Sequence, residues 1–215
     1  MDKPLYILST AFFGPVQYYT KVLTGRVQIE AHENYTKQSY RNRCVVLGAN
    51  GPLTLSVPIH SETFRKIPVR DVRISWSEDW QRIHWRTLVS AYRSSPFFEF
   101  YCDELEAFFR DRPLFLFDLN MSVHQKITEL LNVGNITGLT EDFHTVYSNA
   151  RDFRNSIHPK KRMQIPDPWF RPYPYTQVFS DKTGFVPNLS ILDLLFNAGP
   201  GSGQVLLNSI PMHEM

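Results

Sequence analysis

The chain has 215 residues, of which 42% are hydrophobic and 14% aromatic, so it can form a packed core and is not a generally disordered protein. Its formal net charge of +2 lacks the large positive excess of nucleic-acid-binding proteins, so we expect no nucleic-acid partner. No apolar run approaches the roughly 20 residues that span a bilayer, and two cysteines do not form a disulfide framework. We therefore expect one cytoplasmic domain over residues 1–210.

The first elements predict the opening of an α/β unit. Leu5–Leu8 is a short apolar run typical of a buried strand, and it is too short for a signal peptide. Pro15 suits the first turn of a helix, and Gly25 lies just past its expected end. A second strand is expected over 27–31, parallel to the first. Open sheets of this kind place ligands in the loops after their strands.

Residues 34–43 form a dense polar stretch without glycine, proline or an aliphatic side chain. Ordinary turns contain glycine, proline, aspartate or serine, whereas this stretch offers guanidinium, amide and phenol groups. These groups suit a phosphorylated or sugar-like ligand. The alternative is a solvated loop that leads into an edge strand.

A β-hairpin is predicted over 44–59, because two apolar runs flank the turn pair Asn50-Gly51. Apolar and polar residues alternate over 69–74, which predicts a half-buried strand with Lys66, Arg70 and Arg73 on its solvent side. Together the expected elements predict an α/β fold: a single domain, with a mixed sheet, the hairpin and helices packed on it.

Three helices in series are expected to cover the sheet. Helical spacing begins at Trp80 and runs to Tyr92, with Ser75 or Ser77 as the candidate cap. A second helix follows over 97–109 and a third over 117–133. Near the end of the chain, residues 188–197 predict a short apolar helix.

Between about 150 and 175 the composition changes to a basic, proline-rich loop. Its basic residues are Arg151, Arg154, His158, Lys160, Lys161, Arg162 and Arg171. Loops longer than roughly 12 residues in compact domains are usually functional or disordered. We expect this one to cross beside the polar stretch with its cations toward the site, as a mobile lid or a crossing loop; the alternative is a solvated linker.

The chain carries no familiar catalytic motif and no metal-binding spacing of its seven histidines, so we expect neither metal nor cofactor. His84 is a candidate acid or base, with a packed core histidine as the alternative. Cys44 follows a cationic stretch that would favour its thiolate, but a buried strand would make it inert. Asp193 lies in an apolar helix, needs a partner, and is predicted to pair with Arg41 or Arg43.

Several segments, in this order, resemble the WbqC-like protein family across nearly the full length. They are residues 12–19, 37–43 and 53–59, His84, Ala91-Tyr92, Pro96-Phe97-Phe98 and 185–196. The dipeptide Asn42-Arg43 and the segment from Pro187 to Asp193 are the most specific. Family members commonly carry a Gln-Pro pair after the first strand, where this chain has Ser9-Thr10-Ala11.

The resemblance implies a role in surface-polysaccharide biosynthesis, with transfer of glycine or another acyl group to an activated sugar as the proposed activity. The alternative is a non-catalytic sugar-binding or scaffold protein of a glycan-assembly complex, so an enzymatic role stays open. The catalytic candidates are His84 and Asp193. The candidate substrate-binding residues are Gln17, Tyr18, Lys37, Tyr40, Arg41, Asn42, Arg43 and Asn188.

Overall fold

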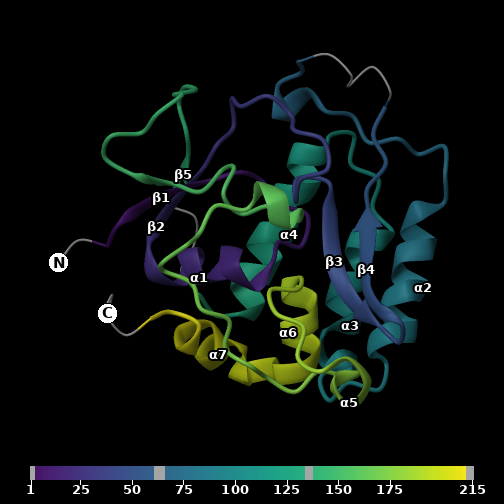
Figure 1. The fold of residues 1–215 in the computed structure, drawn as a ribbon. Coiled ribbons are helices and arrows are strands. Elements are labelled where there is room, and N and C mark those ends of the chain that lie inside the picture. Colours follow the sequence, from purple (N-terminus) through teal and green to yellow (C-terminus); the bar gives the residue numbers. More distant parts are fainter. Residues whose placement is uncertain (1–2, 61–65, 134–137, 212–215) are drawn as a thin grey trace.

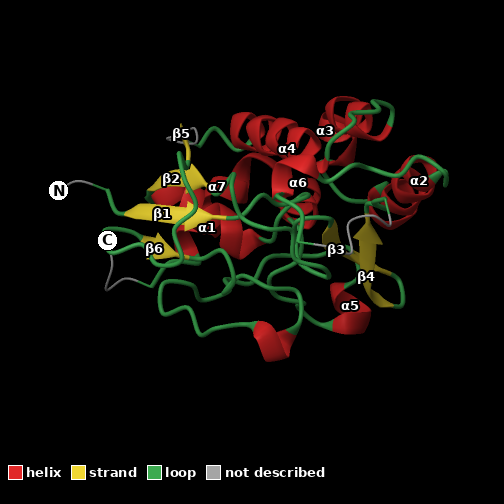
Figure 2. Ribbon diagram, turned by 90° about the horizontal axis from the view of Figure 1, so that it is seen from above, coloured by secondary structure: helices red, strands yellow, loops and turns green. Residues whose placement is uncertain are grey.

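The computed structural model describes residues 3–60, 66–133 and 138–211, and its larger sheet consists of four parallel strands. The strands are β1 (Leu5–Leu8), β2 (Arg26–Ile29), β5 (Gly138–Leu139) and β6 (Arg151–Asp152), in the order β5-β2-β1-β6. Leu5 pairs with Arg26 and Leu8 with Ile29, which confirms the predicted parallel pair. The sheet lies at one end of the molecule (Figure 1, Figure 2).

Helix α1 (Val16–Thr24) connects β1 to β2, as predicted. Pro15 precedes the helix and fixes an extended backbone at its start. Gly25 ends the helix with a φ of −122°, so left-handed geometry is not the reason for glycine here. A Cβ at this position would lie 2.4 Å from the ring of Tyr6 on β1. The glycine therefore lets the helix end pass close to the first strand.

The predicted hairpin is also present. It consists of β3 (Arg43–Gly48) and β4 (Gly51–Ser56), which pair antiparallel. Gly51 has a φ of 111°, a left-handed conformation that glycine adopts without strain. The hairpin is a sheet of its own at the other end of the molecule (Figure 1, Figure 2). The α/β class is confirmed, and its parallel and antiparallel strands belong to two sheets.

The three predicted helices are α2 (Trp80–Tyr92), α3 (Phe98–Glu106) and α4 (Leu116–Leu130). They are followed by α5 (Ser180–Thr183), α6 (Ile191–Ala198) and α7 (Ser202–Asn208). Helix α2 packs against β3, and α3 packs against α6. Helix α6 also packs against α1 and β3, so it lies between the hairpin and the helix that connects the first two parallel strands. Its residues 191–197 are all buried, as its apolar sequence requires.

Two local predictions are wrong. Residues Val69–Asp71 form a 3₁₀ turn instead of a strand, because the N–H of Asp71 bonds back to the carbonyl of Pro68. The apolar residues Val69, Val72 and Ile74 are still buried, and the polar residues Arg70, Asp71 and Arg73 are exposed. The cap of α2 is Asp79; the hydroxyls of Ser75 and Ser77 bond to each other instead.

The basic segment runs across one face of the molecule, green in Figure 1 and along the lower edge of Figure 2. Between residue 153 and Phe179 its regular structure is a single 3₁₀ turn at Lys161–Met163. The segment begins with β6. The residues that directly follow β6 therefore lie at the same sheet edge as the ends of β1 and β2.

Candidate functional site

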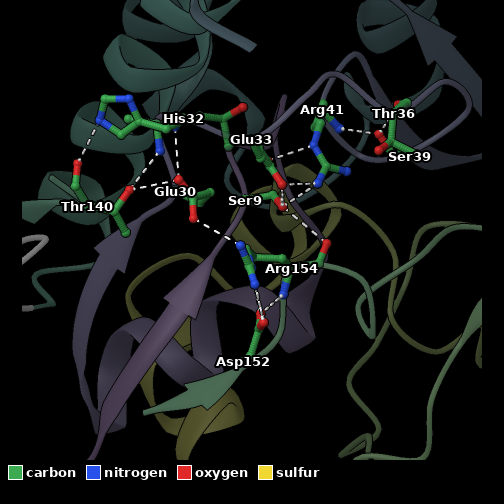
Figure 3. Close-up of polar contacts among 12 residues, drawn as sticks. Ser9, Glu30, His32, Glu33, Thr36, Ser39, Arg41, Thr140, Asp152 and Arg154 are labelled. Carbon is green, nitrogen blue, oxygen red and sulfur yellow. Dashed lines mark hydrogen bonds and ion pairs between the residues drawn. The ribbon is translucent and has the colours of Figure 1, made fainter. Parts of the chain in front are cut away.

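The carboxyl ends of the parallel strands meet at one edge, and polar side chains follow them (Figure 3). Ser9 and Glu30 directly follow β1 and β2, and Thr140 directly follows β5. Arg154 lies two residues beyond β6. In chain order, β2 and then β5 lie on one side of β1, and the last strand, β6, lies on the other side. Open α/β sheets place ligands beside such a reversal of strand order.

Arg41, from the polar stretch, is held at this edge by a buried carboxylate. Its Nε donates to Glu33 Oε1 at 2.8 Å and its Nη2 to Glu33 Oε2 at 2.5 Å. Nη2 also donates to the Ser9 hydroxyl at 2.6 Å. Both charged side chains are almost completely buried. This two-point pairing fixes the polar stretch against the end of β1.

Arg154 forms a second buried network beside the first. Its Nη1 donates to Glu30 Oε2 at 3.0 Å and its Nη2 to Asp152 Oδ2 at 2.6 Å. Glu30 has no exposed surface and also accepts hydrogen bonds from the hydroxyls of Tyr147 and Thr140. Every carboxylate oxygen of Glu30 is therefore paired, which a fully buried charge requires.

The space between these networks is small. A cavity lined by Ser9, Tyr18, Arg41, Arg154 and neighbouring residues has a volume of about 10 Å³. Such a volume holds about one water molecule. The sheet edge in this conformation therefore positions the surrounding chain and has no room for a sugar.

A larger pocket of about 440 Å³, called the outer pocket here, is lined in part by Ser156 from the turn at 154–157, whose Arg154 and Ile157 line the small cavity. Two predicted substrate-binding residues form part of its wall. The amide of Gln17 accepts from Asn188 Nδ2 at 3.1 Å, and its backbone N–H donates to Asn188 Oδ1 at 2.9 Å. Asn188 has a left-handed φ of 57°, which asparagine tolerates better than most residues.

Asp167 fixes the floor of this outer pocket. Its Oδ2 accepts from Lys21 Nζ at 2.7 Å and from Gln17 Nε2 at 2.8 Å. Lys21 and Asp167 have 1% and 3% of their side chains exposed, so the pair is a neutral internal tether. The remaining wall combines polar and apolar side chains: Ser156, Lys161, Gln164, Ile165, Pro166, Phe170, Pro172 and Pro187.

Ser156 is the unusual member of this wall. Its residue is 8% exposed, and its hydroxyl is buried without a hydrogen-bond partner among the described residues. A buried hydroxyl without a partner is costly.

The other predicted binding residues are dispersed. Tyr18 donates to the backbone carbonyl of Ser9 at 3.1 Å, and burial raises the pKa of its phenol. Tyr40 is buried, and burial likewise raises its pKa, while Lys37 is exposed. Asn42 Nδ2 donates to the carbonyl of Val57 at 2.9 Å, so this amide ties the polar stretch to the hairpin.

Arg43 opens β3 and is partly buried. Its Nε is buried without a hydrogen-bond partner among the described residues. Among the predicted binding residues, Tyr18, Tyr40 and Arg41 therefore line the sheet-edge cavity and Gln17 and Asn188 line the outer pocket, whereas Lys37, Asn42 and Arg43 line neither.

The predicted arginine partner of Asp193 is wrong. Its carboxylate accepts from the hydroxyls of Tyr92 at 2.8 Å and Tyr175 at 2.6 Å, and from Gln177 Nε2 at 2.9 Å. Burial raises the pKa of Asp193, although these donors favour the charged form. Neutral donors satisfy this carboxylate, because Arg41 is already paired with Glu33 at the sheet edge. The segment before Asp193 does contact β3, since the N–H of Ser190 donates to the carbonyl of Val45.

His84 and Cys44, the other titratable candidates, are both buried. His84 lies among Phe12, Trp80 and Phe109, and burial lowers its pKa to about 4. Its Nδ1 has no partner among the described residues. Cys44 has no exposed surface, and burial raises its thiol pKa to about 12. Neither side chain lines the sheet-edge cavity or the outer pocket.

The sequence analysis missed the carboxylates of both networks. Glu30 lies near the end of the strand predicted over 27–31 and Glu33 follows it, and that position at the end of a parallel strand was the available signal. The predicted placement of the basic segment beside Arg41 is confirmed for Arg154, which lines the same cavity. Lys161, Arg162 and Arg171 are exposed on the outer side of the segment.

Among the described residues, no three histidine, cysteine or acidic side chains are grouped closely enough to hold a metal ion. Within the same residues, none of the helices has the length and apolar character required to cross a membrane.

Comparison with known proteins finds a matching family model and a similar protein. Residues 12–165 match the model of the WbqC-like protein family. A protein of Mycobacterium tuberculosis (strain ATCC 25618 / H37Rv), named Uncharacterized protein Rv1507c, is 24% identical over 186 residues, which are 77% of this chain and 80% of that protein. No solved structure matches. Since the family model covers well over half of the sequence, the chain belongs to the WbqC-like protein family.

Proposed function

We propose that the protein binds a sugar or an activated sugar in the outer pocket, as a component of surface-polysaccharide biosynthesis. The observation that carries this proposal is the pairing of Gln17 with Asn188 on the wall of a 440 Å³ pocket. Both residues are substrate-binding candidates from the sequence alone, and the pocket is large enough for a monosaccharide unit.

The chemistry of the wall supports a ligand rich in hydroxyl groups. The amide of Gln164 offers a donor and an acceptor, and Phe170 offers an apolar ring. The Asp167 charge is balanced by Lys21, so the floor accepts hydrogen bonds without presenting a net charge. The assignment to polysaccharide synthesis rests on the family.

Transfer of glycine or another acyl group to the bound sugar is the second candidate function. The observation that favours it is the Ser9 hydroxyl, which lies between Glu33 and Arg41 behind the 154–157 turn. His84 and Asp193 do not add support, because each is enclosed elsewhere in the core. Binding without transfer is therefore the function that the geometry favours.

Thermal-shift and calorimetric titrations with neutral monosaccharides, nucleoside diphosphate sugars and free nucleoside diphosphates test the binding proposal. A ligand at 100 times its dissociation constant should stabilise the fold by about 2.7 kcal/mol. Phe170→Ala and Gln164→Ala should each weaken that ligand about tenfold. Phe100→Ala is the matched control, since Phe100 is an exposed ring on α3 far from the pocket residues in sequence.

The outcomes separate the candidates. Binding that Phe170→Ala leaves unchanged would remove the outer pocket as the site. Binding followed by acyl transfer from an aminoacyl or acyl thioester donor, lost in Ser9→Ala, would favour the transferase. No binding of any sugar class at millimolar concentration would contradict the proposal.

A further inference from the structure

Large apolar side chains face solvent at or next to residues that line the outer pocket. Met163, Ile165 and Tyr173 are 52%, 58% and 45% exposed, and all three belong to one stretch of eleven residues inside the basic segment. Ile165 also forms part of the pocket wall. Isolated exposed apolar side chains need no explanation, but a group of them around a binding site indicates an interaction surface.

The exposure of these side chains is fixed by buried anchors. Asp167 is tied to Lys21, and Trp169 packs edge-on against Phe153. Farther along, the N–H of Arg171 donates to the carbonyl of Ser209, and that of Tyr173 donates to the Ser209 hydroxyl. The segment is thus held against the core from Asp167 to Tyr173, and Met163 and Ile165, which precede these anchors, are exposed.

The same surface is positively charged. Lys161, Arg162 and Arg171 are exposed and make no ion pair with any described residue. Asp167 is the one acidic residue of the sequence between positions 159 and 180, and Lys21 neutralises it. Cations without an ion pair, next to exposed apolar side chains, complement a surface that has anionic groups on the outside and an apolar layer below them.

We propose that the part of the basic segment from Lys161 to Tyr173, called the rim here, docks on an anionic membrane surface with the mouth of the outer pocket toward the lipid headgroups. Met163 and Ile165 enter the interface between headgroups and acyl chains, and Lys161 and Arg162 contact lipid phosphates. A nucleic acid would use the cations and leave the apolar side chains exposed to water, so it fits this surface less well.

Docking in this orientation has a direct consequence for the pocket. Lys161 and Ile165 belong both to the rim and to the pocket wall. A ligand anchored in the membrane could then enter the pocket from the bilayer surface, whereas a ligand in solution would reach a mouth that the membrane partly covers. The docking proposal does not depend on the identity of that ligand.

Vesicle co-sedimentation tests the docking. The full chain is mixed with vesicles of phosphatidylcholine alone or of phosphatidylcholine with phosphatidylglycerol, without any sugar. We expect binding to the anionic vesicles that weakens as salt is added. The double variants Met163→Ser/Ile165→Ser and Lys161→Glu/Arg162→Glu should each lower the partition coefficient about tenfold or more.

The matched control is the double variant Ile83→Ser/Arg86→Glu on α2. Ile83 is 57% exposed, close to Ile165, and Arg86 is exposed beside it. This control should bind anionic vesicles like the parent protein. Near-parental thermal unfolding of each variant ensures that lost binding reflects the rim and not the fold.

Three results would overturn the proposal: no binding of the parent protein to anionic vesicles, equal loss in the α2 control, or parental binding by Met163→Ser/Ile165→Ser. The last result would reduce the interaction to surface charge. Failure of every sugar to bind the outer pocket would leave the vesicle result unchanged, so the two proposals fail separately.

Discussion

Glu33 and Asp193 are both buried carboxylates, but they are stabilised in different ways. Glu33 is paired with the guanidinium of Arg41, whereas Asp193 accepts hydrogen bonds from two phenols and an amide. Burying an unpaired carboxylate is costly in either place. A buried carboxylate therefore needs hydrogen-bond donors, and those donors need not be cations. Glu33 thus belongs to an ion pair at the carboxyl end of the parallel sheet, whereas Asp193 lies among neutral donors between α2 and α6.

Removing the cation at the sheet edge should have the largest effect. We expect Arg41→Ala to lower the free energy of unfolding by about 3–5 kcal/mol, because Glu33 would remain buried without its partner. Urea unfolding measures this change. Arg41→Ala/Glu33→Gln should recover part of the loss, since it removes the unpaired charge. A double variant no more stable than Arg41→Ala would show that packing, and not charge, decides the effect.

Truncating the second carboxylate should cost slightly less. Asp193→Ala leaves the hydroxyls of Tyr92 and Tyr175 and the amide of Gln177 without their acceptor, and we expect a loss of about 3 kcal/mol. Asp193→Asn keeps the shape and should cost less. A loss below about 0.5 kcal/mol for the alanine variant, typical of an open surface, would contradict the arrangement.

The pH dependence of stability sharpens the same contrast. The pKa of Asp193 is raised in the folded state, so its contribution is fully present below the ordinary carboxyl pKa of 3.8. It is lost as the pH rises through the raised value, because the unfolded chain ionises first. Relative to Asp193→Asn, the parent protein should therefore become less stable as the pH rises above about 4. Parallel pH profiles for the two proteins would be evidence against a raised pKa.

His84 should give a smaller effect of opposite sign. Burial lowers its pKa from 6.5 to about 4, so its contribution to stability is present above pH 6.5 and is lost as the pH falls toward 4. The two pKa values allow at most about 3 kcal/mol, and we expect about 2 kcal/mol. Acid unfolding followed by circular dichroism should show a shallower decline for His84→Gln. His124, with the same shift, titrates in both proteins and cancels in the comparison.

The smallest effect should come from an ion pair on the surface. Arg110 donates to Glu106 at 2.5 Å, but 71% of the arginine side chain is exposed. Glu106→Ala should change the free energy of unfolding by less than about 0.5 kcal/mol. A change comparable with that of Arg41→Ala would mean that burial is not what distinguishes the sheet-edge pair.

Local patterns predicted most elements, and long-range contacts decided the site. Pro15, Gly25 and the Asn50-Gly51 turn mark element ends within a few residues, and the structure follows them. The partners of Asp193 lie 101, 18 and 16 residues away in the chain, so no spacing revealed them. Residues 69–74 bury their apolar side chains and expose their polar ones without forming a strand. Tertiary packing determines burial there, and isolated β-bridges take the place of a continuous ladder of strand hydrogen bonds. Ser9, which no local pattern marked, joins the Arg41 network through its hydroxyl.

The parallel sheet is long only at its centre. β1 and β2 pair over four residues, whereas the outer strands β5 and β6 add two residues each. The outermost strands of a sheet carry unpaired backbone groups with which another chain can form hydrogen bonds. Short outermost strands carry few such groups. Among the described residues, another copy of this protein would find two residues to pair with on either side of that sheet. The sheet thereby gains protection against edge-to-edge aggregation, and its charged residues remain at the carboxyl end.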